Sequence, residues 1–276
     1  MTQNNNSENP NAQSLQMAVS HSTVFHGDCL EIMKSIPDRS VDMILCDLPY
    51  GTTKCKWDVI IPFDKLWEQY DRIIKPNGAI LLFGQEPFSS YLRISNIKNF
   101  KFDFIWNKKF ASNFAQAKKR PMNIQEIISV FYSSQPTYNP IMKARDKPIK
   151  ATTGSTTSIV SMIDNFNKIE NKIYNEKYPE SILLFPRILG TSQEKTKHPT
   201  QKPLSLFEYL IKTYTNEGDI VLDNCAGSGT TGIACINTNR NYILIEKEQK
   251  YFDIINERID KHKQQRAGEF SFENQS

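Results

Sequence analysis

The sequence has no hydrophobic run long enough to cross a membrane. None of its segments approaches the roughly 18 consecutive apolar residues that a spanning helix needs. Residues 1–21 are polar, and they have neither the basic start nor the apolar middle of a signal peptide. We therefore expect a cytoplasmic protein with a disordered tail over residues 1–21. With 276 residues, 39% of them hydrophobic, the chain can supply one substantial core, or one core and a smaller module.

Cysteine is also scarce. The five cysteines are an odd number, and no two of them form a CxxC pair. A disulfide framework and a zinc site are therefore not indicated, and we expect no bound metal. Free cysteines are often buried as small apolar side chains, which is the role we expect for these.

The net charge is only +4, but the positive charge is unevenly distributed. Residues 98–150 contain eleven lysines and arginines against three acidic residues. Such an excess is compatible with an ordinary solvated surface or with binding of a polyanion. Two clusters are of most interest, and they comprise Lys108, Lys109, Lys118, Lys119 and Arg120.

Short apolar runs alternate with amphipathic stretches along the chain. This alternation predicts an α/β fold with a largely parallel sheet. The expected strands are 41–46, 79–83, 102–106, 127–132, 220–222 and 242–245, and the expected helices are 63–74, 204–214 and 251–261. A turn is expected at residues 76–78, where proline, asparagine and glycine follow one another. Residues 135–197 have few apolar runs and are expected to form an inserted or mobile region.

A glycine-rich loop follows the expected strand at 220–222. Gly227, Gly229 and Gly232 fit the pattern GxGxxG, and Glu246 lies at the end of the next strand, where an acid can bind a ribose diol. The loop alone leaves NAD as a possible ligand. Only 44 residues follow Gly232, however, too few for the rest of a dinucleotide-binding fold. The sheet must therefore be completed by earlier strands, and Asp223 suits a cationic ligand better than a pyrophosphate.

The segment Leu45 to Gly51, LCDLPYG, places an acid, a proline and a tyrosine at the end of an expected strand. Together with DNCAGSGTT at 223–231, it resembles the beta class of amino-methylating DNA methyltransferases, in which the catalytic motif precedes the S-adenosylmethionine loop. Residues 26–51, 198–211 and 242–246 are similar to further segments of that family, in the expected order. Leu48 departs from the pattern, because the family usually has a first proline there.

The resemblance implies a permuted, Rossmann-like, doubly wound fold that uses S-adenosylmethionine. It divides the chain into a catalytic half (22–134), a target-recognition region (135–197), a cofactor-binding half (198–265) and a C-terminal tail (266–276). The catalytic residues would be Asp47, Leu48, Pro49 and Tyr50. The cofactor would be bound by Asp28, Cys29, Asp47, Thr200, Gln201, Lys202, Asp223, Ala226, Gly227, Ser228, Gly229, Thr230, Thr231 and Glu246.

The implied reaction is methylation of an exocyclic amine on a base of double-stranded DNA. Asp47 favours adenine N6, because relatives that act on cytosine N4 more often carry serine there; cytosine N4 stays the alternative. Cytosine C5 methylation is disfavoured, since the chain has no Pro-Cys pair. Glutamine and RNA amine methylation are disfavoured by motif order and by Asp47. A decayed, non-catalytic scaffold is supported only by Leu48. A homodimer and a cognate restriction endonuclease are compatible with the resemblance.

Three residues near the expected cofactor site also fit purely structural roles. Asp28 is also placed to cap a short helix, Glu246 to cap the helix that follows it, and His198 to support its loop. The basic clusters at Lys108 and at Lys118 to Arg120 are expected to meet DNA phosphates beside the catalytic site.

Overall fold

The computed structural model describes residues 22–52, 55, 58–150, 173–192, 195–196 and 200–273, with side chains described as far as residue 268. The expected tail at 1–21 therefore lies outside the described residues. The chain divides into two compact units, residues 1–139 with 181–276, and residues 140–180. No helix within the described ranges is long and apolar enough to span a membrane.

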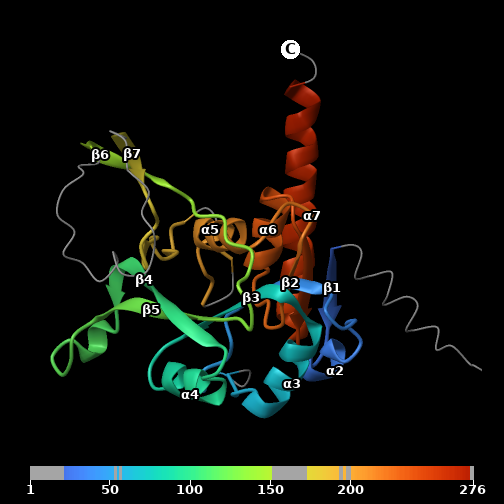
Figure 1. Ribbon diagram of the computed structural model, residues 1–276. Helices are drawn as coiled ribbons and strands as arrows, with labels where there is room; N and C mark the ends of the chain where they lie inside the picture. The colour runs from blue at the N-terminus through green and yellow to red at the C-terminus, as the bar shows by residue number, and fades with distance from the viewer. Residues whose placement is uncertain are drawn as a thin grey trace, which may run out of the picture. The chain divides into compact units, whose positions relative to one another are not determined.

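The first unit is built on an eight-stranded sheet with the order β1-β10-β9-β2-β3-β5-β4-β8. Figure 1 labels β1 to β5 of this sheet, together with the helices of the unit. The strands β1, β10, β9, β2 and β3 run parallel to one another, and β5 pairs antiparallel with both β3 and β4. The expected mostly parallel α/β sheet is confirmed. The bounds are β1 Thr23–His26, β2 Val41–Cys46, β3 Ile74–Gly84, β4 Phe100–Ser112, β5 Asn123–Phe131, β8 Ile182–Leu184, β9 Ile220–Asp223 and β10 Asn241–Glu246.

Helices pack against both faces of this sheet. One core contains side chains of α5, α6 and α7, and the other contains side chains of α2, α3 and α4. Each buried strand therefore supplies apolar side chains to both faces, which explains why the strands read as continuous apolar runs. The helix bounds are α2 Cys29–Met33, α3 Phe63–Ile73, α4 Phe88–Ser95, α5 Leu204–Tyr214, α6 Thr230–Asn237 and α7 Gln249–Glu273, with a short 3-10 helix η1 at Phe114–Gln116.

The strand order reverses between β9 and β2. From β9 the chain continues to β10 on one side, and from β2 it continues to β3 on the other. Ile44 of β2 pairs with Leu222 of β9, so the carboxyl ends of the two strands lie side by side. Open α/β sheets bind ligands at such a switch point, outside the carboxyl ends of the strands. This register brings the motif at Asp47 beside the glycine loop after Asp223.

The structure differs from the expectations in several places. Residues 76–78 belong to the irregular start of β3 and not to a separate turn. Residues 182–184 form β8 of the large sheet, although they were expected in the inserted region; β8 covers the edge of β4, and the Trp106 indole donates to the Phe185 carbonyl. Helix α7 extends to Glu273, beyond the expected start of the tail at residue 266. The second unit, residues 140–180, contains the paired strands β6 Lys143–Lys150 and β7 Ile173–Lys177.

Candidate active site

A cavity of about 540 Å³ opens at the carboxyl ends of the central strands. This volume lies within the range of small-molecule sites. It is lined by every residue predicted for catalysis or cofactor binding except Gly229: Asp28, Cys29, Asp47, Leu48, Pro49, Tyr50, Thr200, Gln201, Lys202, Asp223, Ala226, Gly227, Ser228, Thr230, Thr231 and Glu246. His198 lies outside the described residues.

Four acidic residues follow the ends of four adjacent parallel strands. Asp28 comes shortly after β1, Glu246 ends β10, Asp223 ends β9 and Asp47 comes directly after β2. Because these strands are parallel, all four carboxylates line the same cavity. Lys202 and Lys247 pair with two of these carboxylates, Asp47 and Asp28, and the wall as a whole offers acceptors for a ligand that carries positive charge and hydroxyl groups.

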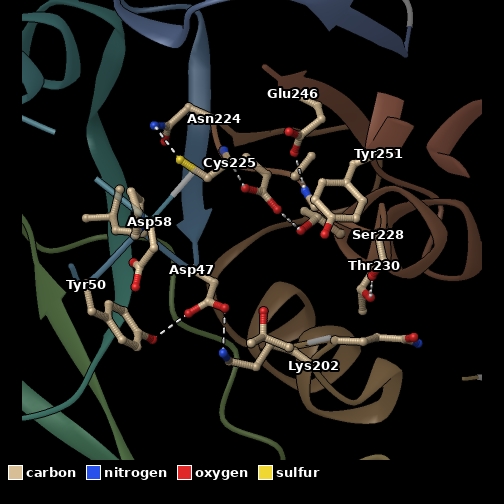
Figure 2. A pocket seen from close by; sticks show the side chains of 18 of the residues that line it. Asp47, Tyr50, Asp58, Lys202, Asn224, Cys225, Ser228, Thr230, Glu246 and Tyr251 are labelled. Atoms are coloured by element: carbon tan, nitrogen blue, oxygen red, sulfur yellow. Dashed lines mark hydrogen bonds and ion pairs between the residues drawn. The ribbon is translucent and has the colours of Figure 1, made fainter. Parts of the chain in front are cut away.

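Asp47 is held by two hydrogen bonds (Figure 2). The Tyr50 hydroxyl donates to Asp47 Oδ1 at 2.5 Å, and Lys202 Nζ donates to Asp47 Oδ2 at 2.5 Å. Burial raises the pKa of Asp47, although Lys202 favours the ionised form. Burial, together with the Asp47 charge, also raises the pKa of Tyr50 well above its usual range, so its hydroxyl remains a donor. Lys202 is 155 positions from Asp47 in the sequence.

The structure accounts for leucine at position 48. Its side chain is 4% exposed and belongs to the core that also contains Cys46 and Phe88. The Tyr50 ring packs against the same Phe88, with ring centroids 5.0 Å apart. Leu48 therefore anchors the loop at residues 47–50 through apolar contacts, whereas Pro49 supplies the backbone restriction.

Asp58 organises the loop that follows the motif, and the sequence analysis did not identify it. Its carboxylate accepts the backbone N–H of Gly51 through Oδ1 and that of Thr52 through Oδ2, both at 2.9 Å. Asp58 is buried and lines the cavity (Figure 2). These two hydrogen bonds close the loop onto the site just after Tyr50.

The glycine loop is organised around Asp223. Its Oδ1 accepts the backbone N–H of Cys225 at 3.1 Å, and its Oδ2 accepts the hydroxyl of Thr231. Asp223 is buried, and this burial raises its pKa to about 7. A cation bound in the cavity would favour the ionised form.

Two glycines of the loop are required for close packing. Gly229 has φ of +74°, and a Cβ there would lie 3.1 Å from Ile255. A Cβ at Gly232 would lie 2.8 Å from Leu244 Cδ1. These glycines let α6 lie against β10 and α7, so the N-terminus of α6 reaches the cavity. Gly229 thus contributes through the backbone, without lining the cavity itself.

Glu246 and Asp28 already serve structural roles. Glu246 Oε2 accepts the N–H of Gly227 at 2.8 Å and Oε1 accepts that of Glu248 at 2.9 Å, while burial raises its pKa. Asp28 Oδ1 caps α2 by accepting the N–H of Leu30 at 3.0 Å. Carboxylate oxygens have further lone pairs, so both residues can still accept ligand hydroxyl or amino groups. The hydrogen bond to Gly227 thereby fixes the glycine loop and the Glu246 carboxylate relative to each other.

The prediction that Lys108 meets DNA phosphates is wrong. Lys108 is only 4% exposed, lines the cavity and forms an ion pair with Glu126, with Nζ 3.4 Å from Oε1. Lys108 lies on the same face of β4 as the buried Phe104 and Trp106, because side chains alternate along a strand. Glu126 has the same relation to Ile128 of β5, and the sequence analysis missed it. The alternation of side chains along each strand was the sequence signal that could have shown Lys108 and Glu126 to be buried.

The other basic residues of the predicted DNA surface are exposed. Lys109 lies near the end of β4, and Lys118, Lys119 and Arg120 follow η1 in the connection between β4 and β5. Ser112, which ends β4, lines the cavity. These cations are therefore close in sequence to the cavity wall and free to face a polyanion.

Comparison with known proteins agrees with this geometry. A family model described as DNA methylase, N6_N4_Mtase, matches residues 41–257. The DNA adenine methyltransferase YhdJ of Escherichia coli K12 is 31% identical over 250 residues, covering 86% of this chain and 82% of that protein. The type II methyltransferase M.HpaI of Haemophilus parainfluenzae is 26% identical over 242 residues, covering 84% and 72%.

A solved structure has a similar fold. The crystal structure of an M1.HpyAVI-SAM complex has a TM-score of 0.57 and 29% identity, and the match covers 86% of this chain and 98% of that one. The family match spans most of the sequence, including both the Asp47 motif and the glycine loop. The chain therefore belongs to the DNA methylase family of S-adenosylmethionine-dependent N6 and N4 methyltransferases.

Proposed function

We propose that this protein transfers a methyl group from S-adenosylmethionine to N6 of adenine in double-stranded DNA. The observation that carries the proposal is the position of Asp47. Its carboxylate lies in the cavity beside the glycine loop, on the neighbouring strand of the switch point. The name of YhdJ, a DNA adenine methyltransferase, supports adenine as the target.

An exocyclic amine is a weak nucleophile because its lone pair is delocalised into the ring. Acceptors aimed at the amine hydrogens localise that pair and take up the positive charge that develops on nitrogen. The Asp47 carboxylate and a backbone carbonyl at Leu48 or Pro49 are the acceptors we propose. S-adenosylmethionine supplies the methyl group, and transfer is direct. The base must leave the duplex to reach this cavity, and the Tyr50 ring would stack on it.

The residues of the cavity fit the cofactor. We propose that Asp28 and Cys29 lie at its adenine, Glu246 at its ribose, and Asp47, Asp223 and residues 200–202 at its methionine end. The carboxylates of the wall match the sulfonium and amino charges. The N-terminus of α6, which starts at Thr230, offers backbone N–H groups to the carboxylate at the methionine end of the cofactor.

For the DNA surface we propose Lys109, Lys118, Lys119 and Arg120. All four are exposed cations whose segment adjoins the cavity wall at Ser112. Target recognition we assign to residues 140–180, which form a separate unit within the expected inserted region 135–197. A homodimer, a partner restriction endonuclease and a cytoplasmic location remain predictions from the family resemblance.

The first experiment is methyl transfer with tritiated S-adenosylmethionine and unmethylated genomic DNA, followed by digestion to nucleosides. Label in N6-methyladenine is the expected result. Label in N4-methylcytosine would keep the mechanism and replace the target base, since the family includes both activities. Absence of label, with cofactor binding demonstrated by calorimetry, would refute DNA methylation as the function.

A further inference from the structure

A row of four alternating charges extends from Asp47 into the protein. Lys202 Nζ lies 2.5 Å from Asp47 Oδ2 and 3.3 Å from Glu126 Oε2, and Lys108 Nζ lies 3.4 Å from Glu126 Oε1. Side chains of Lys202, Glu126 and Lys108 are 10% exposed or less. All four residues line the cavity. Lys202 is therefore shared between two carboxylates, of which only Asp47 belongs to the catalytic motif.

Both oxygens of Asp47 are engaged in this arrangement. Oδ1 accepts the Tyr50 hydroxyl and Oδ2 accepts Lys202 Nζ. An amine that approaches Asp47 as a hydrogen-bond donor can use the further lone pairs of the carboxylate, but it shares the negative charge of Asp47 with these two donors. Lys202 takes up more of that charge than Tyr50 does, because a charged donor binds a carboxylate more tightly than a neutral hydroxyl does. Asp47 thus accepts the amine of the target base more strongly when the Lys202 contact lengthens.

Glu126 offers Lys202 a second position. Glu126 Oε2 is buried and, among the described residues, has no hydrogen-bond partner; its contact with Lys202 is an ion pair without hydrogen-bond geometry. The ammonium also lies 5.3 Å from the ring centroid of Phe83, a surface that tolerates a cation. A short movement of Nζ from Asp47 toward Glu126 would convert the ion pair into a hydrogen bond.

We propose that Glu126 is a positioning residue that takes over Lys202 when Asp47 accepts the amine of the target base. The proton stays on Lys202, and no bond is made or broken in the exchange. Without Glu126, releasing Lys202 would leave a buried ammonium without a carboxylate, which is energetically costly. Lys108 completes the arrangement, because it keeps Glu126 ionised and leaves the row neutral in sum. The inference rests on the proposed function.

The electrostatic directions agree with this arrangement. Burial opposes ionisation of Glu126, but Lys202 and Lys108 hold its pKa below the ordinary value. Burial likewise opposes the charge of Lys202, but Asp47 and Glu126 raise its pKa. The charge of Glu126 also raises the pKa of Asp47. Removing that charge should therefore lower the pKa of Asp47 and tighten its contact with Lys202.

The test is Glu126→Gln, which keeps the shape of the side chain and removes its charge. We expect kcat to fall by about 10- to 100-fold, because Lys202 no longer leaves Asp47 readily, while the Kd for S-adenosylmethionine stays within about threefold. We also expect the acid limb of the kcat/KM profile to move to lower pH. In the protein without ligands, the variant should also have a lower Asp47 pKa than the wild type. This pKa can be measured by ¹³C NMR of labelled aspartate, in which the Asp47 signal is identified by its absence in Asp47→Asn.

Two further variants serve as controls. Glu208→Gln makes the same chemical change at a part-buried glutamate of α5, which accepts a hydrogen bond from Asn237 at 2.6 Å. Because Glu208 is not among the residues that line the cavity, this variant should change neither the rate nor the pH profile. Glu126→Gln with Lys108→Gln removes the ion pair as a unit and avoids an unpaired lysine. This double variant should fold if the single one does not, and it should show the same loss of kcat and the same pH displacement.

The outcomes separate the inference from the proposed function. An active wild-type protein whose folded Glu126 variants keep kcat, or leave the acid limb and the Asp47 pKa unmoved, would overturn the role of Glu126 alone. A wild-type protein that labels no DNA would refute the proposed function, and the role of Glu126 in it would fail at the same time. A fall in kcat without any pH displacement would assign Glu126 a purely structural role and would also overturn the inference.

Discussion

Replacing Asp223 with asparagine should change how the stability of the protein depends on pH. Burial raises the pKa of Asp223 from 3.8 to about 7, so the folded state disfavours the ionised carboxylate. A folded-state pKa above the unfolded one means that stability is fully present below about pH 4 and is lost as the pH rises to about 7. Above that pH the loss is complete and constant.

The magnitude follows from the size of the shift. Each pKa unit corresponds to about 1.4 kcal/mol, so the wild-type protein should lose about 3 kcal/mol between about pH 5 and pH 7 through this group alone. Asp223→Asn cannot ionise and retains an acceptor for the Cys225 N–H, while the Thr231 hydroxyl can reverse its hydrogen bond. Its free energy of unfolding should therefore fall less over the same interval.

The assay is urea unfolding of both proteins at several pH values between about 5 and 8, without cofactor. The difference between the two free energies should grow in favour of the variant by about 3 kcal/mol across this range. All other titrating groups are common to both proteins and cancel in the difference. Parallel pH dependences would show that Asp223 is ionised throughout, and the argument from burial would then be wrong.

Three further predictions concern catalysis and DNA binding. Asp47→Ala should leave the Kd for S-adenosylmethionine within about tenfold and reduce methylation at least about 100-fold, measured by calorimetry and tritium transfer; near-normal turnover would remove Asp47 from the mechanism. Asp58→Ala should lower the free energy of unfolding by about 1–3 kcal/mol and reduce kcat, because two part-buried backbone N–H groups lose their hydrogen bonds to a carboxylate; urea titration showing no loss would contradict this. Charge reversal at Lys118 and Lys119 should weaken DNA binding and flatten its salt dependence in fluorescence anisotropy, whereas reversal at the exposed Lys65 should not; an unchanged slope would place the DNA surface elsewhere.

Periodicity in the sequence predicted the buried framework well. The expected strand at 41–46 and the expected helix at 204–214 have the same bounds in the structure, since continuous apolar runs and helical spacing report burial directly. The turn expected at 76–78 lies instead within β3, in the irregularity between the pairs Val41–Ile74 and Met43–Ala79. The proline and the glycine therefore fall where the ladder between β2 and β3 is interrupted.

The candidate site was predictable only in part. The motif at Asp47 and the glycine loop carry local patterns, and both line the cavity. Asp58 has no such pattern, since its role depends on how the chain folds back onto Gly51. Glu126 and Lys108 lie on the buried face of their strands. A charged residue in such an apolar pattern is ordinarily interpreted as the point where the buried part of the strand ends. Only the pairing of β4 with β5 shows that the two charges neutralise each other.

The pairing of β2 with β9 sets the order in which the protein can mature during synthesis. Strand β2 is made first, yet its neighbour on one side, Ile220–Asp223, lies far downstream in the sequence and emerges from the ribosome much later. Until then one edge of β2 has no strand beside it, and long-range pairings of this kind form slowly. Asp47 meets Lys202, which is 155 positions away in the sequence, and the glycine loop only after this whole stretch has been made. A nascent chain therefore carries the Asp47 motif before it has the loop that lines the other side of the cavity.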